Sequence, residues 1–340
     1  MKNFILKLKG ILLKHIPSKI KKTLKFFQHE ISFNSLIEDR LFLPLTDLEG
    51  LTKDIPHEAH SINEINGINI FYGIAQTIKH YVGLPESYSL KANYTHMFYG
   101  RPWHGDLDNR LPVCLVWSDA MREEFLKCTK KPVFTVGPPI AYAPNLYSEQ
   151  KILAEKYRLG RNALIFPAHS THYIEAQFDI DALLDKARML NEQFDSVRFC
   201  IYWKDYLSGK SQAFLESEFE CVTAGHIYDP LFYSRLKALL STADHTFGNS
   251  VGTHIGLSIG LGIPHTIFPS KIEYTKPYYT QNDKYTKNFI AFSKLFISDY
   301  STISEEQVNV VNRYFGFSQK KSPGEFREIL QTAEYLYHKN

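Results

Sequence analysis

The sequence predicts an α/β protein made of two doubly wound, parallel-sheet domains with a deep cleft between them. Its 340 residues exceed the roughly 250–300 that one hydrophobic core usually serves. The composition, 44% hydrophobic and 22% charged, is that of a folded chain. Short apolar runs alternate with helical stretches along its length, which is typical of parallel sheets whose strands are joined by helices.

The first 29 residues form a basic segment of their own. Eight lysines and no acidic residue precede Glu30. The apolar residues at helical spacing between them are Leu8, Ile11, Leu12 and Ile16. The apolar runs are far shorter than the ~20 residues that span a bilayer, whereas each lysine near an anionic leaflet contributes about 1 kcal/mol. We therefore expect residues 1–29 to be an amphipathic helix that holds a cytoplasmic protein on the inner face of the cytoplasmic membrane. The alternative is a solvated helix packed on the body.

The rest of the chain argues against two classes of protein. After residue 29 it carries 31 basic and 36 acidic residues, which does not suit a nucleic-acid-binding surface. The cysteines show neither the framework of a disulfide-stabilised secreted domain nor a metal-binding pattern. They are Cys114, Cys128, Cys200 and Cys221. We expect free, buried thiols in a cytoplasmic protein.

The N-terminal domain is predicted to span residues 30–140. Apolar runs at 111–117 and 132–136 are its clearest strands, and a helix is expected between them over 118–130. Residues 137–144 then hold three prolines and a glycine, which stop regular structure and stiffen a connection. The domain boundary is therefore placed there.

The C-terminal domain is predicted to span residues 141–322. Its expected strands lie at 163–166, 197–202, 219–223, 245–247 and 266–268. In doubly wound sheets of this kind, ligands bind at the carboxyl ends of the strands. A C-terminal helix is expected over 323–340, with Ser322 as N-cap, Pro323 at the first helical position and Glu325 completing a capping box.

Polar loops follow the first three of these strands and should meet at one edge of the sheet. Such loops can supply hydrogen-bond donors for a diphosphate, imidazoles for a leaving phosphate and an aromatic ring for a base. The candidate residues in these loops for binding a nucleotide sugar are His169, Ser170, Thr171, Trp203, Lys204, Gly225 and His226.

The loop over residues 248–253 is the most suggestive, because it lies between a predicted strand and a helix expected over 254–261. The candidate binding residues here are Asn249, Ser250, Gly252 and Thr253. Ser250 or Thr253 can cap the helix, its free amides and dipole attract an anion, and Gly252 lets a ligand approach closely. The alternative is an ordinary capped turn between a strand and a helix.

An aromatic, histidine-rich segment covers residues 94–106. If the chain transfers a sugar, a group must take the proton of the acceptor hydroxyl, and His or Asp with a pKa near neutrality suits that role. His96, His104 and Asp106 are the candidate catalytic bases. The alternative is a structural loop whose polar groups are merely hydrogen-bonded.

No metal site is predicted. His169 and His172 are spaced as a pair, but neither an HExxH helix nor a cysteine cluster accompanies them. We expect a metal-independent enzyme whose nucleotide sugar is a co-substrate, with no further cofactor.

Several of these segments resemble a group of proteins associated with bacterial O-antigen and capsule synthesis. The resemblance covers about residues 90–335. It rests on residues 136–143, 166–172, 202–205, 223–229, 249–256 and 314–317. It implies a glycosyltransferase of the GT-B architecture, in which two Rossmann-like domains face each other across the cleft.

Two more distant resemblances point the same way. Trp103-His104-Gly105, Ser118-Asp119 and Asn249-Ser250 are similar in order to motifs of the CDP-glycerol glycerophosphotransferases, where His104 would match the base and Ser250 a phosphate-capping serine. The GT-B sialyltransferases and Kdo transferases, which use CMP-sugars, have a histidine and a serine or threonine at the same two places.

The resulting expectation is a hexosyl- or CMP-sugar-type transferase that moves a sugar from its nucleotide to a lipid-linked or growing bacterial surface glycan, such as the O-antigen of lipopolysaccharide or a capsule. The donor would bind the C-terminal domain and the acceptor the N-terminal domain. A polyol-phosphate transferase, a sugar-nucleotide epimerase and a non-catalytic assembly protein remain as alternatives.

Overall fold

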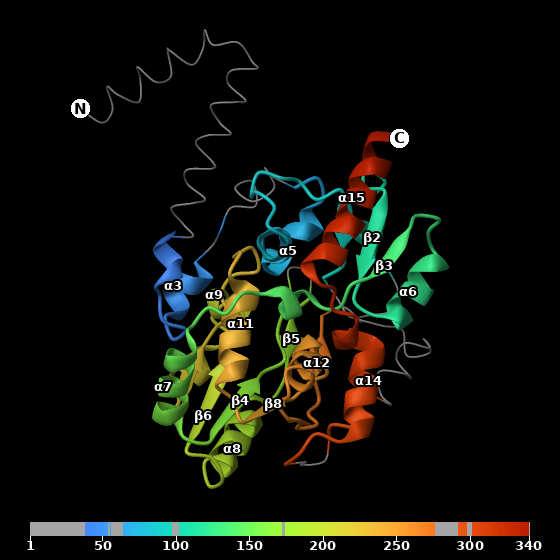
Figure 1. Ribbon diagram of the computed structural model, residues 1–340. Coiled ribbons are helices and arrows are strands. Elements are labelled where there is room, and N and C mark those ends of the chain that lie inside the picture. The colour runs from blue at the N-terminus through green and yellow to red at the C-terminus, as the bar shows by residue number, and fades with distance from the viewer. Residues whose placement is uncertain are drawn as a thin grey trace, which may run out of the picture.

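The computed structural model describes residues 38–53, 55, 64–96, 102–171, 174–275, 292–297 and 301–339. The basic segment at residues 1–29 lies outside them. Within the described part, no helix has the length and apolar character to cross a membrane. The fold is mixed α/β, with two parallel sheets and a short antiparallel pair of strands (Figure 1).

The smaller sheet has three parallel strands in the order β1-β2-β3. They are β1 (Ala92–Tyr94), β2 (Val113–Val116) and β3 (Val133–Thr135). Helix α6 (Asp119–Leu126) joins β2 to β3, and the Ser118 side chain caps it by accepting a hydrogen bond from the amide of Met121. The two strands and the helix predicted in this region are confirmed, each shorter than its sequence pattern.

Short helices surround this sheet. They are η2 (Gly67–Gly73), α5 (Ile74–Val82), η3 (His104–Leu107) and η4 (Pro139–Tyr142). Helix α3 (Leu48–Thr52) precedes them in the chain but packs on α9 (Trp203–Leu207), beside the larger sheet. Helix η4 lies in the proline-rich connection that the sequence predicts between the domains.

The larger sheet has five parallel strands in the order β7-β6-β4-β8-β9. They are β4 (Asn162–Phe166), β6 (Ser196–Cys200), β7 (Glu220–Val222), β8 (His245–Gly248) and β9 (His265–Ile267). All five strands predicted in this half are present. The strand order reverses between β4 and β8, and doubly wound sheets bind ligands beyond the carboxyl ends of the strands at such a point.

Helices lie on both faces of the larger sheet. They are α7 (Glu149–Leu159), α8 (Ile180–Leu190), α9 (Trp203–Leu207), α10 (Gln212–Leu215), α11 (Phe232–Ser241) and α12 (Thr253–Gly260). Successive residues of β4 enter different cores: Ala163 and Ile165 pack with α8, whereas Leu164 packs with α11 and α12. This is the alternation expected of a strand that is covered on both sides. The antiparallel pair β5 (Ala176–Gln177) and β10 (Glu273–Tyr274) forms a separate two-stranded sheet.

The C-terminal segment returns to the first half of the chain. It contains α14 (Glu305–Phe315), η5 (Phe317–Gln319) and α15 (Pro323–Lys339). Helix α15 packs on α5, and the Arg327 side chain donates to the carbonyl of Val82 at 2.6 Å. The predicted capping box is confirmed, because Ser322 and Glu325 exchange hydrogen bonds. One continuous core therefore joins the three-stranded sheet, α15 and one face of the larger sheet.

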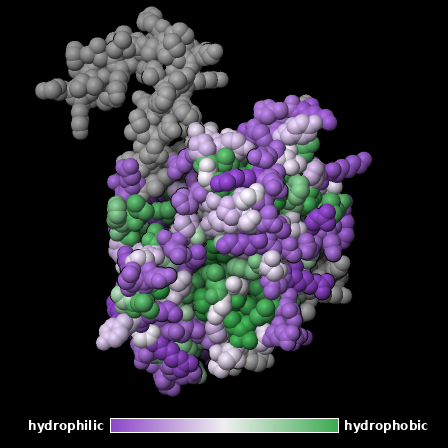
Figure 2. Space-filling model, in the orientation of Figure 1, coloured by the Kyte–Doolittle hydropathy of each residue, from purple (hydrophilic) through white to green (hydrophobic). Residues whose placement is uncertain are grey.

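The four cysteines are free. Cys114 is buried in β2, and Cys200 and Cys221 are half-buried, but Cys128 is exposed. The expectation of burial is therefore wrong for Cys128, which follows the exposed end of α6 instead of lying in a strand. In the view of Figure 2, hydrophilic residues cover most of the surface, and apolar residues gather in the lower centre, in the region of α12.

Candidate functional site

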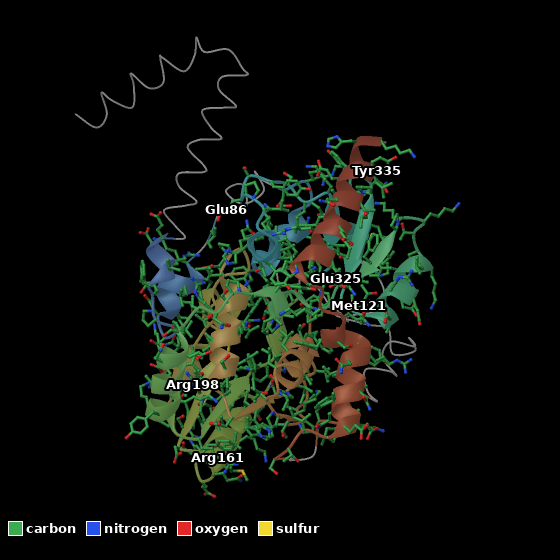
Figure 3. All side chains as sticks on the ribbon, viewed as in Figure 1. Glu86, Met121, Arg161, Arg198, Glu325 and Tyr335 are labelled. Atoms are coloured by element: carbon green, nitrogen blue, oxygen red, sulfur yellow. The ribbon has the colours of Figure 1, made fainter. Side chains whose placement is uncertain are left out.

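The loops after β4 and β8 meet where the strand order of the larger sheet reverses. The backbone amide of Ala168 donates a hydrogen bond of 2.6 Å to the side-chain oxygen of Asn249, and both residues are buried. In Figure 3, Arg161, which precedes β4, lies at the bottom, so the carboxyl ends of the strands point upward, toward α5 and the smaller sheet. This edge of the sheet is the candidate site.

The bond from Ala168 fixes the orientation of the Asn249 side chain. Because Oδ1 accepts the hydrogen bond, the other end of the amide is the donor, Nδ2. This nitrogen is buried and finds no hydrogen-bond acceptor among the described residues. Buried polar groups in native proteins are almost always paired, so Nδ2 is a donor available to a ligand.

His254 offers a second group at the same place. Its ring stacks on Phe166, and its Nε2 is buried without a partner in the described part of the chain. A Cβ atom on Gly248 would lie 2.8 Å from that Nε2, so only glycine leaves the imidazole this room. Burial lowers the pKa of His254 to about 3, nearby His169 acts in the same direction, and a backbone hydrogen bond with Ser250 opposes them. His254 is therefore neutral at physiological pH.

The start of α12 differs from the prediction. Gly252, and neither Ser250 nor Thr253, is the N-cap residue, and no side chain caps the helix. The expected serine or threonine cap is wrong because Gly252 is extended at the helix start and Thr253 is already the first helical residue. The first turn of α12 thus lacks the side-chain acceptor that usually occupies its positive end.

The loop after β4 is held by its own polar groups. The Ser170 amide donates to the Asp205 carboxylate at 3.0 Å, and the Ser170 hydroxyl accepts from the amide of Ala176. The amide of Thr171 donates to the carbonyl of Ile174 at 2.7 Å. His169 is exposed, and its ring centroid lies 4.1 Å from that of Tyr202. Of the three predicted residues in this loop, His169 presents its side chain outward. His172 lies outside the described residues.

The loops after β6 and β7 pack on each other. The buried rings of Trp203 and His226 lie 4.1 Å apart, and His226 accepts a hydrogen bond from the amide of Tyr228. The Lys204 ammonium lies 6.0 Å from the Trp203 ring. Gly225 has a φ of +98°, a left-handed conformation that favours glycine.

A buried ionic cluster supports the β7 loop. The Asp229 carboxylate lies 2.7 Å from the Arg235 guanidinium and 3.6 Å from that of Arg40. A Cβ on Gly225 would lie 3.1 Å from Arg235. Breaking such a buried pair leaves an uncompensated charge, so we expect the cluster to stabilise the loop that carries His226.

The smaller sheet reaches the same place through η2. Tyr72 has a φ of +57°, which is strained for a tyrosine, and its amide donates to the carbonyl of Ile227 at 2.5 Å. Its hydroxyl lies 3.3 Å from that of Tyr202. His96 lies two residues after β1. The centroid of its ring is 5.1 Å from that of Phe71 and 6.4 Å from that of Tyr72. The carboxyl ends of β1 and β6 therefore meet at Tyr72.

The other predicted bases lie on η3. Asp106 is buried, accepts a hydrogen bond from the amide of Trp103, and has its pKa raised by burial to about 6. His104 is exposed beside the ring of Trp103. Burial lowers the pKa of His96 to about 4. The aromatic contacts to η2 place His96, of the three, beside the loops of the larger sheet.

Besides Phe166, four aromatic residues of this site are absent from the sequence-based candidates. They are Phe71, Tyr72, Tyr202 and Tyr228. Tyr202 stands at the carboxyl end of a predicted strand, where ligands are expected, so its position in the sequence could have identified it. No sequence feature identifies Phe71 and Tyr72, because their position depends on a backbone conformation that tyrosine rarely adopts.

Comparisons with known proteins leave the family open. No protein-family model matches the chain. No curated protein sequence matches it. Among solved structures, it is similar to S. aureus MnaA in a co-structure with UDP, at a TM-score of 0.35 and 10% sequence identity, over 74% of this chain and 67% of that chain.

Proposed function

We propose that this protein is a glycosyltransferase that moves a sugar from a nucleotide-sugar donor to a lipid-linked or growing glycan. The observation that carries the proposal is the buried Nδ2 of Asn249, which is unpartnered within the described residues and belongs to the loop that leads into the uncapped start of α12. A side-chain donor and the positive end of a helix together attract an anion. The phosphate of the donor, a diphosphate in most nucleotide sugars and a single phosphate in a CMP-sugar, is the anion that such a transferase must bind.

The neighbouring groups suit the rest of the donor. Burial keeps His254 neutral, its ring has a backbone hydrogen bond with Ser250, and its Nε2 has no partner within the described residues. In this proposal Nδ1 is the nitrogen that donates to Ser250, and Nε2 is an acceptor. A neutral acceptor of this kind binds a hydroxyl of the ribose or of the sugar. Ser250, Gly252 and Thr253 line the diphosphate in this proposal, and His169 and His226 face the phosphates or the base.

The acceptor side is assigned to the first half of the chain. His96 is neutral and its Nδ1 has no partner among the residues that are described. Asp106, with a pKa of about 6, has the basicity that proton abstraction near neutral pH requires. Either group, or His104, is proposed to take the proton of the acceptor hydroxyl.

The proposal includes two domains, residues 30–140 and 141–322, that close on the donor. Closure would exclude water and limit hydrolysis of the nucleotide sugar. Residues 1–29, with eight lysines, are proposed to hold the enzyme at the inner face of the cytoplasmic membrane, where a lipid-linked acceptor is found.

A thermal-shift screen with UDP, GDP, CDP and CMP tests the donor site. One nucleotide should stabilise the protein, by about 2.7 kcal/mol at a concentration of 100 times its Kd. The Asn249→Ala variant should lose that shift. If none of the four nucleotides stabilises the protein, the proposal is wrong and an assembly role gains support.

A second assay separates transfer from the alternatives. The protein is incubated with the sugar nucleotide of the base found in the screen, with and without bacterial membranes as acceptor. A glycosyltransferase releases the nucleotide only with acceptor, whereas an epimerase converts the sugar nucleotide without one. A CDP-polyol donor in place of a sugar nucleotide would indicate the polyol-phosphate transferase.

A further inference from the structure

A cavity of about 240 Å³ lies next to the candidate site, between the loop after β4 and helix α10. Its walls are mostly apolar, and its lining includes Ala168, Phe178, Ile201 and Phe214. Tyr202 and His169, which also belong to the candidate site, line the same cavity. An apolar pocket with a few polar groups is typical of a small-molecule subsite.

The hydroxyl of Ser211 is the first polar group of the cavity, and it has no hydrogen-bond partner within the described residues. Ser211 lines the cavity and is 2% exposed, and its hydroxyl is buried without a hydrogen-bond partner in the ranges that the structure covers. The backbone of Ser211 is engaged, since its amide donates to the carbonyl of Asp205. A buried hydroxyl that is left unpaired is costly, so its persistence here indicates a ligand that pairs with it.

The second polar group is the carboxylate of Asp205. Both of its oxygens accept from the amide of Ser170, at 3.0 and 3.3 Å, which fixes its orientation. A carboxylate has about four acceptor positions, so it can take a further hydrogen bond from an N–H donor. Lys210 also lines the cavity, but its ammonium pairs with Glu175 at 3.1 Å. The charge of Asp205 therefore disfavours a phosphate here, and the apolar walls would leave most hydroxyls of a sugar unpaired.

A planar heterocycle satisfies all of these conditions. Its faces are apolar enough for the ring of Phe214 and the side chain of Ile201, and its edge offers N–H donors for Asp205 and a carbonyl or ring nitrogen for Ser211. The cavity also connects to the predicted phosphate position, because Ala168 lines it and donates to Asn249. We propose that this cavity binds the base of the nucleotide, an inference that rests on the proposed function.

Two variants test the assignment. Ser211→Ala removes the unpaired hydroxyl, and Ala176→Leu fills the cavity from β5, where Ala176 is part of the lining. Ser241→Ala is the matched control, because that serine lines a different cavity, beside α7 and α11. Thermal unfolding establishes that each variant is folded before binding is measured.

Isothermal titration with UDP, GDP, CDP and CMP, and separately with inorganic pyrophosphate, gives the readout. We expect the wild type to bind one of the nucleotides. Ser211→Ala should weaken that binding about five- to tenfold, and Ala176→Leu by more. Neither variant should change the affinity for pyrophosphate, and Ser241→Ala should behave as the wild type.

The failures of the two proposals are distinguishable. If the wild type binds a nucleotide and both variants bind it equally well, the base lies elsewhere and this assignment alone is overturned. If the variants lose affinity for the nucleotide and for pyrophosphate to the same degree, the cavity stabilises the fold and does not bind the base. If the wild type binds none of the nucleotides, the proposed function fails and this inference fails with it.

Discussion

The backbone amide of Ala168 holds the side-chain oxygen of Asn249 at 2.6 Å, across the point where the strand order of the larger sheet reverses. This bond decides which end of the asparagine amide remains for a ligand. It leaves Nδ2 buried and unpaired within the described residues, in a loop that leads into a helix without a side-chain cap. The relationship is the physical basis of the proposed donor site.

Replacing Asn249 by aspartate is the most selective test of that basis. A carboxylate can still accept from Ala168, so the fold should survive, but it offers no donor and repels a diphosphate. We expect nucleotide binding to weaken roughly tenfold to hundredfold, measured by titration calorimetry. Asn191→Asp, at the exposed end of α8, is the control. Equal affinities in Asn249→Asp and wild type would contradict the assignment.

The raised pKa of Asp106 predicts a stability effect that depends on pH. The folded state binds the proton more tightly than the unfolded state, with a pKa of about 6 against 3.8. The unfolding free energy should therefore fall as pH rises from about 4 to 6, by roughly 3 kcal/mol at most. Asp106→Asn should be more stable than the wild type at pH 8 and show no such gain at pH 4. Urea unfolding at both pH values measures this, and a pH-independent difference would be inconsistent with it.

His96 should have the opposite effect on the pH dependence of the unfolding free energy. Its pKa is about 4 in the folded protein against 6.5, so the unfolded state takes up the proton first as pH falls. The stability present above pH 6.5 should decrease by about 3 kcal/mol as the pH falls to 4. His96→Gln should reduce this acid sensitivity and leave the unfolding free energy at pH 8 nearly unchanged. If the unfolding free energy of the variant falls with acid as steeply as that of the wild type, His96 is not held neutral in the folded protein.

The two glycines that flank α5 allow a matched comparison. Gly73 and Gly83 have nearly the same left-handed φ, +69° and +70°, which costs any other residue about 1–2 kcal/mol. A Cβ on Gly73 would also overlap the carbonyl oxygen of Pro230, whereas on Gly83 it meets only the flexible end of Arg327 at 3.3 Å. Gly73→Ala should therefore cost at least about 3 kcal/mol and Gly83→Ala about 1, by urea unfolding. Equal costs would mean that the close approach of η2 to the β7 loop is not as described.

Membrane association is tested by deleting residues 1–29. The full chain should float with liposomes that contain anionic lipid, and high salt should reduce flotation because the attraction is electrostatic. The shortened protein should stay in the soluble fraction. If it floats as well as the full chain, the basic segment is not the anchor.

Much of the fold follows from local sequence signals. The strands of the larger sheet are short apolar runs, and the caps at Ser118 and Ser322 are formed by serines followed by helical stretches. These features depend on residues that are close in the sequence. The expected cap at Ser250 or Thr253 failed because it depended on the exact residue at which α12 begins, which turn composition does not determine.

The site was less predictable because its contacts are not local. Tyr72 and Tyr202 are separated by 130 positions, and their meeting depends on a tyrosine held in the left-handed region. The role proposed for Ser211 could not be predicted either, since only the folded chain shows that its hydroxyl is buried beside a cavity. By contrast, His169, His226 and Asn249 follow strands of the larger sheet directly, and topology alone brought them to one edge.

A structure of the protein in complex with the nucleotide that stabilises it will show directly where the donor binds. We expect phosphate oxygens within hydrogen-bond distance of Asn249 Nδ2 and of the first-turn amides of α12, with the base directed toward Ser211. A nucleotide bound away from the loops after β4 and β8 would mean that the proposed donor site is wrong.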